Sequence, residues 1–182
     1  MHGTTVLVRP LGGPEEAQAC ARMMANSEPW ITLRFEYEFC LQRLAESSRE
    51  VYVAVVQEAV AGFVILNLGG PFKGYVQTIG VMPQWRGQGV GGKLMAFAEE
   101  RIFRECPNVF LCVSSFNVEA QNFYTKLGFQ WVGELKDYVV KGHSEYLMRK
   151  TVGPMMGKAE NRKPKAELLP EGQKTKPEGR KA

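Results

Sequence analysis

Four glycines in six positions constrain this 182-residue chain more than any other feature of its sequence. The segment Gly87-Gln88-Gly89-Val90-Gly91-Gly92 follows a strand-like run and opens a helix-like one. Each glycine costs a helix up to about 1 kcal/mol relative to alanine, so such a cluster needs a reason. Without Cβ atoms the backbone can approach a ligand closely, and the N–H groups of a first helical turn point outward. Together with the helix dipole and Arg86, these donors favour an anion such as a pyrophosphate.

Two other phosphate-binding motifs fit this segment poorly. The Walker motif matches Gly87 to Lys93 but needs a serine or threonine next, where this chain has Leu94. The GxGxxG motif of dinucleotide-binding domains also starts at Gly87, but it belongs after the first strand of its fold. Here several predicted strands precede the glycines, so neither nucleotide-binding class is favoured.

Hydrophobic periodicity divides the chain into strands and helices. Val90, Leu94, Ala98 and Ile102 repeat every four positions, which predicts a helix with one buried stripe. The predicted strands cover residues 5–9, 51–56, 59–68, 75–82, 109–113, 129–135 and 145–148, and the predicted helices cover residues 14–25, 32–46, 90–104 and 118–127. The order β-α-α-β-β-β-α-β-α-β-β predicts a single α/β domain, a mixed sheet with helices on its faces.

The net charge of +4 comes from the C-terminal end of the chain. Residues 153–182 contain 8 basic and 4 acidic residues, four prolines and no aromatic residue. Such a segment buries too little apolar surface to offset the entropy lost when its backbone is ordered. We therefore expect a folded domain over residues 1–152 and a disordered, basic, proline-rich tail over residues 153–182. The domain itself is neutral, so its charge does not indicate a nucleic-acid groove.

The four cysteines and two histidines form neither a metal-binding nor a disulfide pattern. Cys20, Cys40, Cys106 and Cys112 have no CxxC spacing, and we interpret them as buried thiols in a reducing cytoplasm. No apolar run approaches the roughly 18 residues that cross a bilayer, and the first residues lack the pattern of a secretory signal. The sequence therefore predicts a cytoplasmic protein without a metal cofactor and without a membrane partner.

Two motifs resemble those of the GNAT superfamily of N-acetyltransferases. The run Arg86-Gly87-Gln88-Gly89-Val90-Gly91 resembles the family's (Gln/Arg)-x-x-Gly-x-(Gly/Ala) motif. The segment from Asn117 to Phe129 is similar to its Asn-x-x-Ala-x-x-Phe-Tyr-x-x-x-Gly-Phe motif. The resemblance covers about residues 4–150 and includes the order of elements. It implies the GNAT fold and the transfer of an acetyl group from acetyl-CoA to a primary amine by direct attack, the acceptor being a small molecule or a protein N-terminus.

The resemblance also implies which residues bind the cofactor. Backbone amides from Gln88 to Lys93 would hold the pyrophosphate, and the edge of the strand ending at Met82 would pair with the pantetheine. Asn117 would bond the pantetheine arm, and it is also placed to cap the helix that follows. The expected cofactor-binding residues are Ile79, Gly80, Val81, Met82, Arg86, Gly87, Gln88, Gly89, Val90, Gly91, Gly92, Lys93, Asn117, Phe123 and Tyr124.

Tyr124 is the catalytic residue that the resemblance implies. Its phenol would act as general acid and protonate the departing CoA thiolate. The alternative is a helical aromatic residue that packs beside Phe123. Trp30, Phe35, Tyr37 and Tyr138 are expected either to line the acceptor pocket or to pack in the core.

The general base is left open. In the ribosomal-protein alanine acetyltransferase branch, which this chain loosely resembles, a glutamate stands five residues before the motif asparagine, where this chain has Cys112. Glu36, Glu38 and Glu145 are the acids considered for the acceptor pocket, although a solvated surface position is expected for each. A water relayed from Gln77 or from backbone carbonyls is a further alternative, and an acceptor amine of low pKa, such as a peptide N-terminus, would need little help.

Two other classes of function are considered beside the enzyme. A catalytically idle acyl-CoA sensor would account for the missing base, whereas Asn117 and Tyr124 favour the enzyme. A nucleic-acid-binding accessory is disfavoured, because the tail has no aromatic residues for stacking and its acids alternate with its lysines. A homodimer is compatible with the sequence, which does not fix the oligomeric state.

Overall fold

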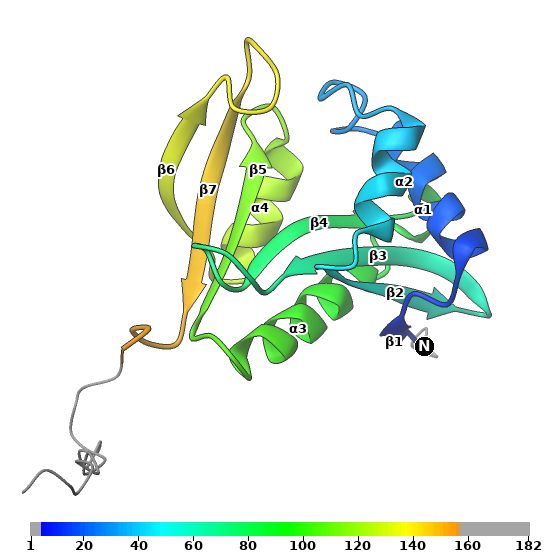
Figure 1. Ribbon diagram of the computed structural model, residues 1–182, viewed down its shortest axis with the longest axis horizontal. Coiled ribbons are helices and arrows are strands. Elements are labelled where there is room, and N and C mark those ends of the chain that lie inside the picture. The colour runs from blue at the N-terminus through cyan, green and yellow to red at the C-terminus, as the bar shows by residue number, and fades with distance from the viewer. Residues whose placement is uncertain (1–4, 157–182) are drawn as a thin grey trace, which may run out of the picture.

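A seven-stranded mixed sheet, in the order β1-β2-β3-β4-β5-β7-β6, organises the computed structural model, which describes residues 5–156 (Figure 1). The strands are β1 (Leu7–Pro10), β2 (Glu50–Val56), β3 (Ala59–Asn67), β4 (Tyr75–Val81), β5 (Asn108–Ser114), β6 (Gln130–Lys136) and β7 (Ser144–Thr151). The helices are α1 (Pro14–Ala25), α2 (Tyr37–Ala45), α3 (Val90–Phe103) and α4 (Val118–Lys126), with a 3-10 helix η1 (Pro83–Trp85) before α3. The predicted fold class and order of elements are confirmed. Most of the predicted tail, residues 157–182, lies outside the described residues.

The second helix starts later than its sequence pattern predicts. Residues 32–46 were expected to be helical, but α2 begins at Tyr37, and the residues before it form turns. The carboxylate of Glu28 accepts hydrogen bonds from the backbone N–H (3.3 Å) and the hydroxyl (3.0 Å) of Thr32, and these bonds stabilise the turn. Arg34 then adopts a left-handed φ of 59°, which a right-handed helix does not accommodate, so the helix cannot run through this residue.

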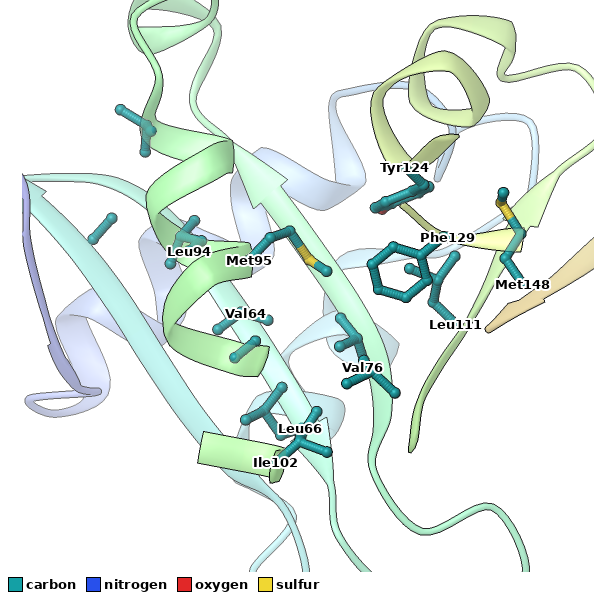
Figure 2. Packing of buried hydrophobic residues seen from close by; sticks show 14 of the residues in the cluster. Val64, Leu66, Val76, Leu94, Met95, Ile102, Leu111, Tyr124, Phe129 and Met148 are labelled. Atoms are coloured by element: carbon teal, nitrogen blue, oxygen red, sulfur yellow. The ribbon is translucent and has the colours of Figure 1, made fainter. Parts of the chain in front are cut away.

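Helices cover both faces of the sheet. Figure 1 shows α1 and α2 on one side of β2, β3 and β4, and α3 on the other side. The stripe predicted for α3 (Val90, Leu94, Ala98 and Ile102) is buried. Leu94 and Ile102, together with Met95, pack against Val64 and Leu66 of β3 (Figure 2). Truncating such residues to alanine typically costs about 2–5 kcal/mol, so this layer contributes much of the stability.

The two middle strands of the sheet stay together over only a short distance. β4 and β5 run parallel and pair only as Tyr75 with Phe110 and Val76 with Leu111. Beyond this point β4 continues along β3, whereas β5 pairs with β7 as far as Ser114. The sheet therefore divides into two arms, and the edge of β4 that faces β5 has no strand partner from Gln77 onward (Figure 1).

A β-bulge lies where the two arms separate. Ile65 pairs with Thr78 and Leu66 pairs with Val76, so Gln77 is the extra residue of β4. An unpaired extra residue bends its strand and increases its twist. The bulge therefore directs β4 away from β5 at the place where their pairing ends.

Gly74 holds the short junction between β4 and β5. Its carbonyl accepts a hydrogen bond of 2.9 Å from the N–H of Phe110, and its φ of +83° lies in the left-handed region. A Cβ at this position would overlap the carbonyl oxygen of Asn108 and lie 2.6 Å from Cγ2 of Ile102. The two strands can therefore approach each other only if this residue is glycine.

We expect Gly74→Ala to destabilise the fold more than Gly70→Ala. Gly70 also has a left-handed φ, of +75°, but a Cβ there would meet no atom within 4 Å. Both variants carry the cost of the left-handed backbone, about 1–2 kcal/mol, and only Gly74→Ala adds an overlap. Chemical denaturation should show a further loss of about 1–3 kcal/mol for Gly74→Ala. Equal losses would show that the junction tolerates a side chain.

Candidate functional site

A pocket of about 600 Å³ lies where three parts of the chain meet: the glycine-rich turn (residues 87–92), the free edge of β4, and α4. Most of the residues predicted to bind the cofactor line it. They are Ile79, Gly80, Val81, Arg86, Gly87, Gly89, Val90, Gly91, Gly92, Asn117, Phe123 and Tyr124. We call this pocket the glycine-turn pocket. Segments far apart in the sequence thus form one wall, as the two motifs predict.

Three of the predicted cofactor-binding residues do not line the glycine-turn pocket. Met82 is buried in the core with α1, and its N–H donates to the carbonyl of Ala61 at 2.9 Å. The Gln88 side chain donates to the carbonyl of Gln84 at 2.8 Å, and Lys93 is exposed on α3. That these three residues contact the cofactor stays a prediction, and their absence from the lining of the glycine-turn pocket does not support it.

The glycine-rich turn presents unpaired backbone donors. Gly87 and Gly89 have φ angles of +71° and +81°, and α3 begins directly after Gly89. Among the described residues, the first N–H of this turn bonded to the backbone is that of Lys93, which donates to Gly89 at 3.1 Å. The earlier N–H groups can therefore bind an anion at the positive end of the helix dipole.

Gly92 shows that the protein itself does not require every one of these glycines. Its φ is not in the left-handed region, and a Cβ there would meet no described atom within 4 Å. Neither backbone strain nor packing therefore accounts for glycine at this position. A ligand that lies close to the backbone would account for it, as expected of a turn that binds an anion.

A second pocket of about 650 Å³ lies between the two arms of the sheet. α2 and the turns before it form one side, and β5, β7 and the β6–β7 loop form the other. We call it the inter-arm pocket. It shares six lining residues with the glycine-turn pocket, so the two pockets meet there: Pro29, Trp30, Ile79, Asn117, Ala120 and Tyr124.

Trp30 rests on the backbone of β4 at this junction. A Cβ on Gly80 would overlap the methyl group of Met23 and would lie 2.8 Å from Phe63 and 3.1 Å from Trp30. The missing side chain of Gly80 therefore lets the indole pack onto the strand. Of the other aromatic residues considered for the acceptor pocket, Phe35 and Tyr138 line the inter-arm pocket, whereas Tyr37 does not and packs against the core with α1.

Asn117 caps α4 and also lines both pockets. Its Oδ1 accepts a hydrogen bond of 3.1 Å from the N–H of Ala120, so the predicted N-cap is confirmed. Because the oxygen is used by the cap, the amide nitrogen is left to donate elsewhere. The cap and a contact with a bound cofactor are therefore compatible.

Tyr124 is packed in the core and also lies where the two pockets meet. The side chain is 7% exposed and packs near the rings of Phe123 and Phe129, with centroids 5.3 and 5.9 Å away (Figure 2). No described residue hydrogen-bonds its hydroxyl. Burial raises the pKa of the phenol, so the group stays protonated and can act as a donor.

Glu145 is buried at the inter-arm pocket, so the surface position expected for it is wrong. It is 5% exposed and lies opposite Ser114, whose hydroxyl donates to Oε1 at 2.6 Å. Burial raises the pKa of this carboxyl, and the hydrogen bond from Ser114 opposes that shift. Glu36 and Glu38 are exposed and do not line the pocket.

Two further polar groups belong to the inter-arm pocket. Cys112 lines it on β5, and burial raises the pKa of its thiol. Gln77, the bulge residue, lines it too, and its Oε1 is buried without a hydrogen-bond partner among the described residues. The water relay from Gln77 therefore stays an alternative to a carboxylate base.

The described residues contain no group of three or more acidic, histidine or cysteine side chains that could hold a metal ion. Within the same range, the longest apolar helices are too short or too polar to span a bilayer.

The fold and the glycine-rich turn define a CoA-dependent acyltransferase, and comparison with known proteins gives the family. The profile of the acetyltransferase (GNAT) family matches residues 16–129, so the chain belongs to this family. An N-alpha-acetyltransferase of Sulfurisphaera tokodaii is 32% identical over 128 residues, which cover 63% of this chain and 76% of that protein. The N-alpha-acetyltransferase RimI of Mycobacterium tuberculosis is 32% identical over 147 residues, which cover 76% and 88%.

The solved structures agree with this assignment. NAA60 of Arabidopsis thaliana in complex with acetyl-CoA superposes with a TM-score of 0.67 at 20% identity, over 81% of this chain and 99% of that one. At this identity the likeness shows the fold. The family and its named relatives make the protein an N-acetyltransferase that uses acetyl-CoA, as the motifs predict, and nothing favours an idle acyl-CoA sensor.

We expect Gly89→Val to weaken CoA binding at least about tenfold, near 1.4 kcal/mol. A β-branched residue disfavours the left-handed φ of +81° and covers the backbone donors of the turn. Gly142→Val is the matched control, because its φ of +92° gives a similar strain in the β6–β7 turn, away from the glycine-turn pocket. Calorimetry should show the loss in Gly89→Val alone, and unchanged affinity in a folded Gly89→Val variant would contradict the prediction.

Proposed function

We propose that this protein acetylates a primary amine where its two pockets meet, by direct attack of the amine on the acetyl-CoA thioester. The observation that carries the proposal is the wall that the two pockets share, which includes Trp30, Asn117 and Tyr124. A cofactor in the glycine-turn pocket and an amine in the inter-arm pocket would each reach this wall. Their reactive groups could then lie side by side, which removes the entropic cost of bringing them together.

The chain's own residues would bind and orient the cofactor. The N–H groups of the glycine-rich turn would hold the pyrophosphate, with Arg86 at the same end of the pocket. The free edge of β4 near Ile79 would offer backbone groups to the pantetheine amides and to the thioester carbonyl. Bound acetyl-CoA supplies the activated acetyl group.

Tyr124 would act as general acid. The amine nitrogen bonds to the carbonyl carbon, the carbon–sulfur bond breaks, and the phenol gives its proton to the departing sulfur. Its position at the junction supports this role, and the phenol carries a proton at neutral pH, although its raised pKa makes complete proton transfer to sulfur less favourable. A hydrogen bond that shares the proton would suffice to stabilise the thiolate.

Glu145 would act as general base, directly or through one water. It is the carboxyl group that lines the inter-arm pocket, and it stands on β7 beside β5, the strand on which Cys112 replaces the glutamate of related enzymes. Its burial raises its pKa toward the range in which a carboxylate accepts a proton effectively. The carboxylate would take the proton that the amine loses.

The relatives named as N-alpha-acetyltransferases support a protein or peptide N-terminus as the acceptor. A small-molecule amine is the alternative, and a pocket of about 650 Å³ is large enough for one. We also propose a cytoplasmic location, which the four free cysteines support.

We expect Tyr124→Phe to lower kcat by roughly 10²-fold, the range for one general acid. The variant keeps the ring that packs near Phe123 and Phe129, so the melting temperature and the affinity for CoA should hardly change. Steady-state kinetics with an N-terminal peptide acceptor would measure the effect. A variant with the wild-type kcat would remove Tyr124 from the mechanism.

We expect Glu145→Gln to lower kcat/KM by roughly 10²-fold at neutral pH and to abolish the acidic limb of its pH profile. Ser114→Ala tests the same carboxyl without removing it. The hydrogen bond from Ser114 favours the charged form, so its loss raises the pKa of Glu145 and should move the acidic limb to higher pH. If Glu145→Gln keeps the wild-type pH profile, the base is another group, and the water relay from Gln77 becomes the leading alternative.

A further inference from the structure

Arg43 is a largely buried cation in the wall of the inter-arm pocket. It lies on α2, and its guanidinium stands 5.3 Å from the ring centroid of Phe35 and 5.4 Å from that of Phe39. Its Nη2 donates a long hydrogen bond of 3.4 Å to the hydroxyl of Thr78 on β4. The fork of this side chain is therefore held between α2 and β4, at the pocket.

Arg43 forms no ion pair with a carboxylate among the described residues, although Glu46 lies near enough to act on its charge. Its Nε is buried without a hydrogen-bond partner among the same residues. The nearby carboxylate of Glu46 pairs with Arg49 at 2.7 Å, and Arg49 keeps its own Nε and Nη1 buried and unpartnered. Two neighbouring guanidinium groups therefore share one carboxylate.

Such an arrangement costs free energy unless another group offsets it. Burial lowers the pKa of Arg43, and the adjacent charge of Arg49 lowers it further. Removing a cation from water is costly, and a cation–π contact returns only part of that cost. The stacking on Phe35 and Phe39 thus leaves a deficit that an anion in the pocket would remove.

Charge is distributed unevenly across the inter-arm pocket. Arg34 and Arg43 lie on the side formed by α2 and the preceding turn, and Glu145 lies on the side formed by β7. These three are the charged side chains among its lining residues. The pocket therefore presents positive charge on one wall and a carboxyl group on the opposite wall.

We infer that the amine acceptor carries a carboxylate, which Arg43 binds with Arg34 at the rim while the amine lies on the Glu145 side near Tyr124. This inference rests on the proposed function and adds the chemical class of the acceptor. A guanidinium fork matches the two oxygens of a carboxylate and is the preferred protein group for them. The carboxylate can belong to a free amino acid or to an acidic side chain next to a peptide N-terminus.

The test compares acceptors that differ only in a carboxylate or an amide. One pair is a short C-terminally amidated peptide that begins with glutamate and its counterpart that begins with glutamine. The other pair is a free amino acid and its amide. With the full chain and saturating acetyl-CoA, we expect kcat/KM to favour the carboxylate by at least about tenfold, near 1.4 kcal/mol, in one of the two pairs. The pair that shows the preference identifies the source of the carboxylate.

Arg43→Met should abolish this preference, mainly through a higher KM for the carboxylate acceptor. Its affinity for CoA, which would bind in the glycine-turn pocket, should stay close to the wild type, and its activity on the carboxylate acceptor should fall further than its activity on the amide acceptor. Arg43→Lys keeps the charge without the fork and should retain a reduced preference. Arg104→Ala is the matched control, because Arg104 is exposed on the surface and paired with Glu100, so the ratio should not change.

Each outcome separates the inference from the proposed function. Equal activity of the wild type on both members of both pairs would overturn the carboxylate site and leave the acetyltransferase reaction standing. A preference that survives in folded Arg43→Met and Arg43→Lys variants would show that Arg43 only packs between the two rings. If the wild type acetylates none of these amines, the proposed function fails and the inference fails with it.

Discussion

The separation of β4 from β5 is the constraint on which the rest of this structure depends. Two residue pairs and the carbonyl of Gly74 hold the strands together at one end, and the bulge at Gln77 turns β4 away directly afterwards. A parallel pair that continued would fill the space with backbone hydrogen bonds and leave no edge for a ligand. Because the pairing stops, one domain offers both an open strand edge and a pocket between two arms.

The sequence predicts the elements well because its local signals are strong. Pro14 begins α1 as expected, and the turn at Gln57-Glu58 between β2 and β3 adopts left-handed φ angles of 49° and 65°. The glycine-rich turn and Asn117 lie where the two motifs place them. In each case the signal depends on a few neighbouring residues, so no long-range contact is needed to interpret it.

The polar lining of the inter-arm pocket could not be predicted in the same way. Glu145 is buried only because β7 pairs with β5 and places it opposite Ser114, far away in the sequence. Arg43 was not singled out, although an arginine four residues after Phe39 on the apolar side of α2 was an available signal. A charged residue is normally expected on the surface, and only the packing of elements that are distant in the sequence shows which ones are buried.

The junction of the two pockets has a consequence for the order of chemical events. The pockets have separate linings except for the residues that they share, so a cofactor in one and an amine in the other would be present together before any bond changes. Cys112, the thiol at this site, has a raised pKa and so is not a ready nucleophile that would carry the acetyl group between them. The geometry therefore favours a sequential mechanism through a ternary complex over a ping-pong mechanism with an acetylated enzyme.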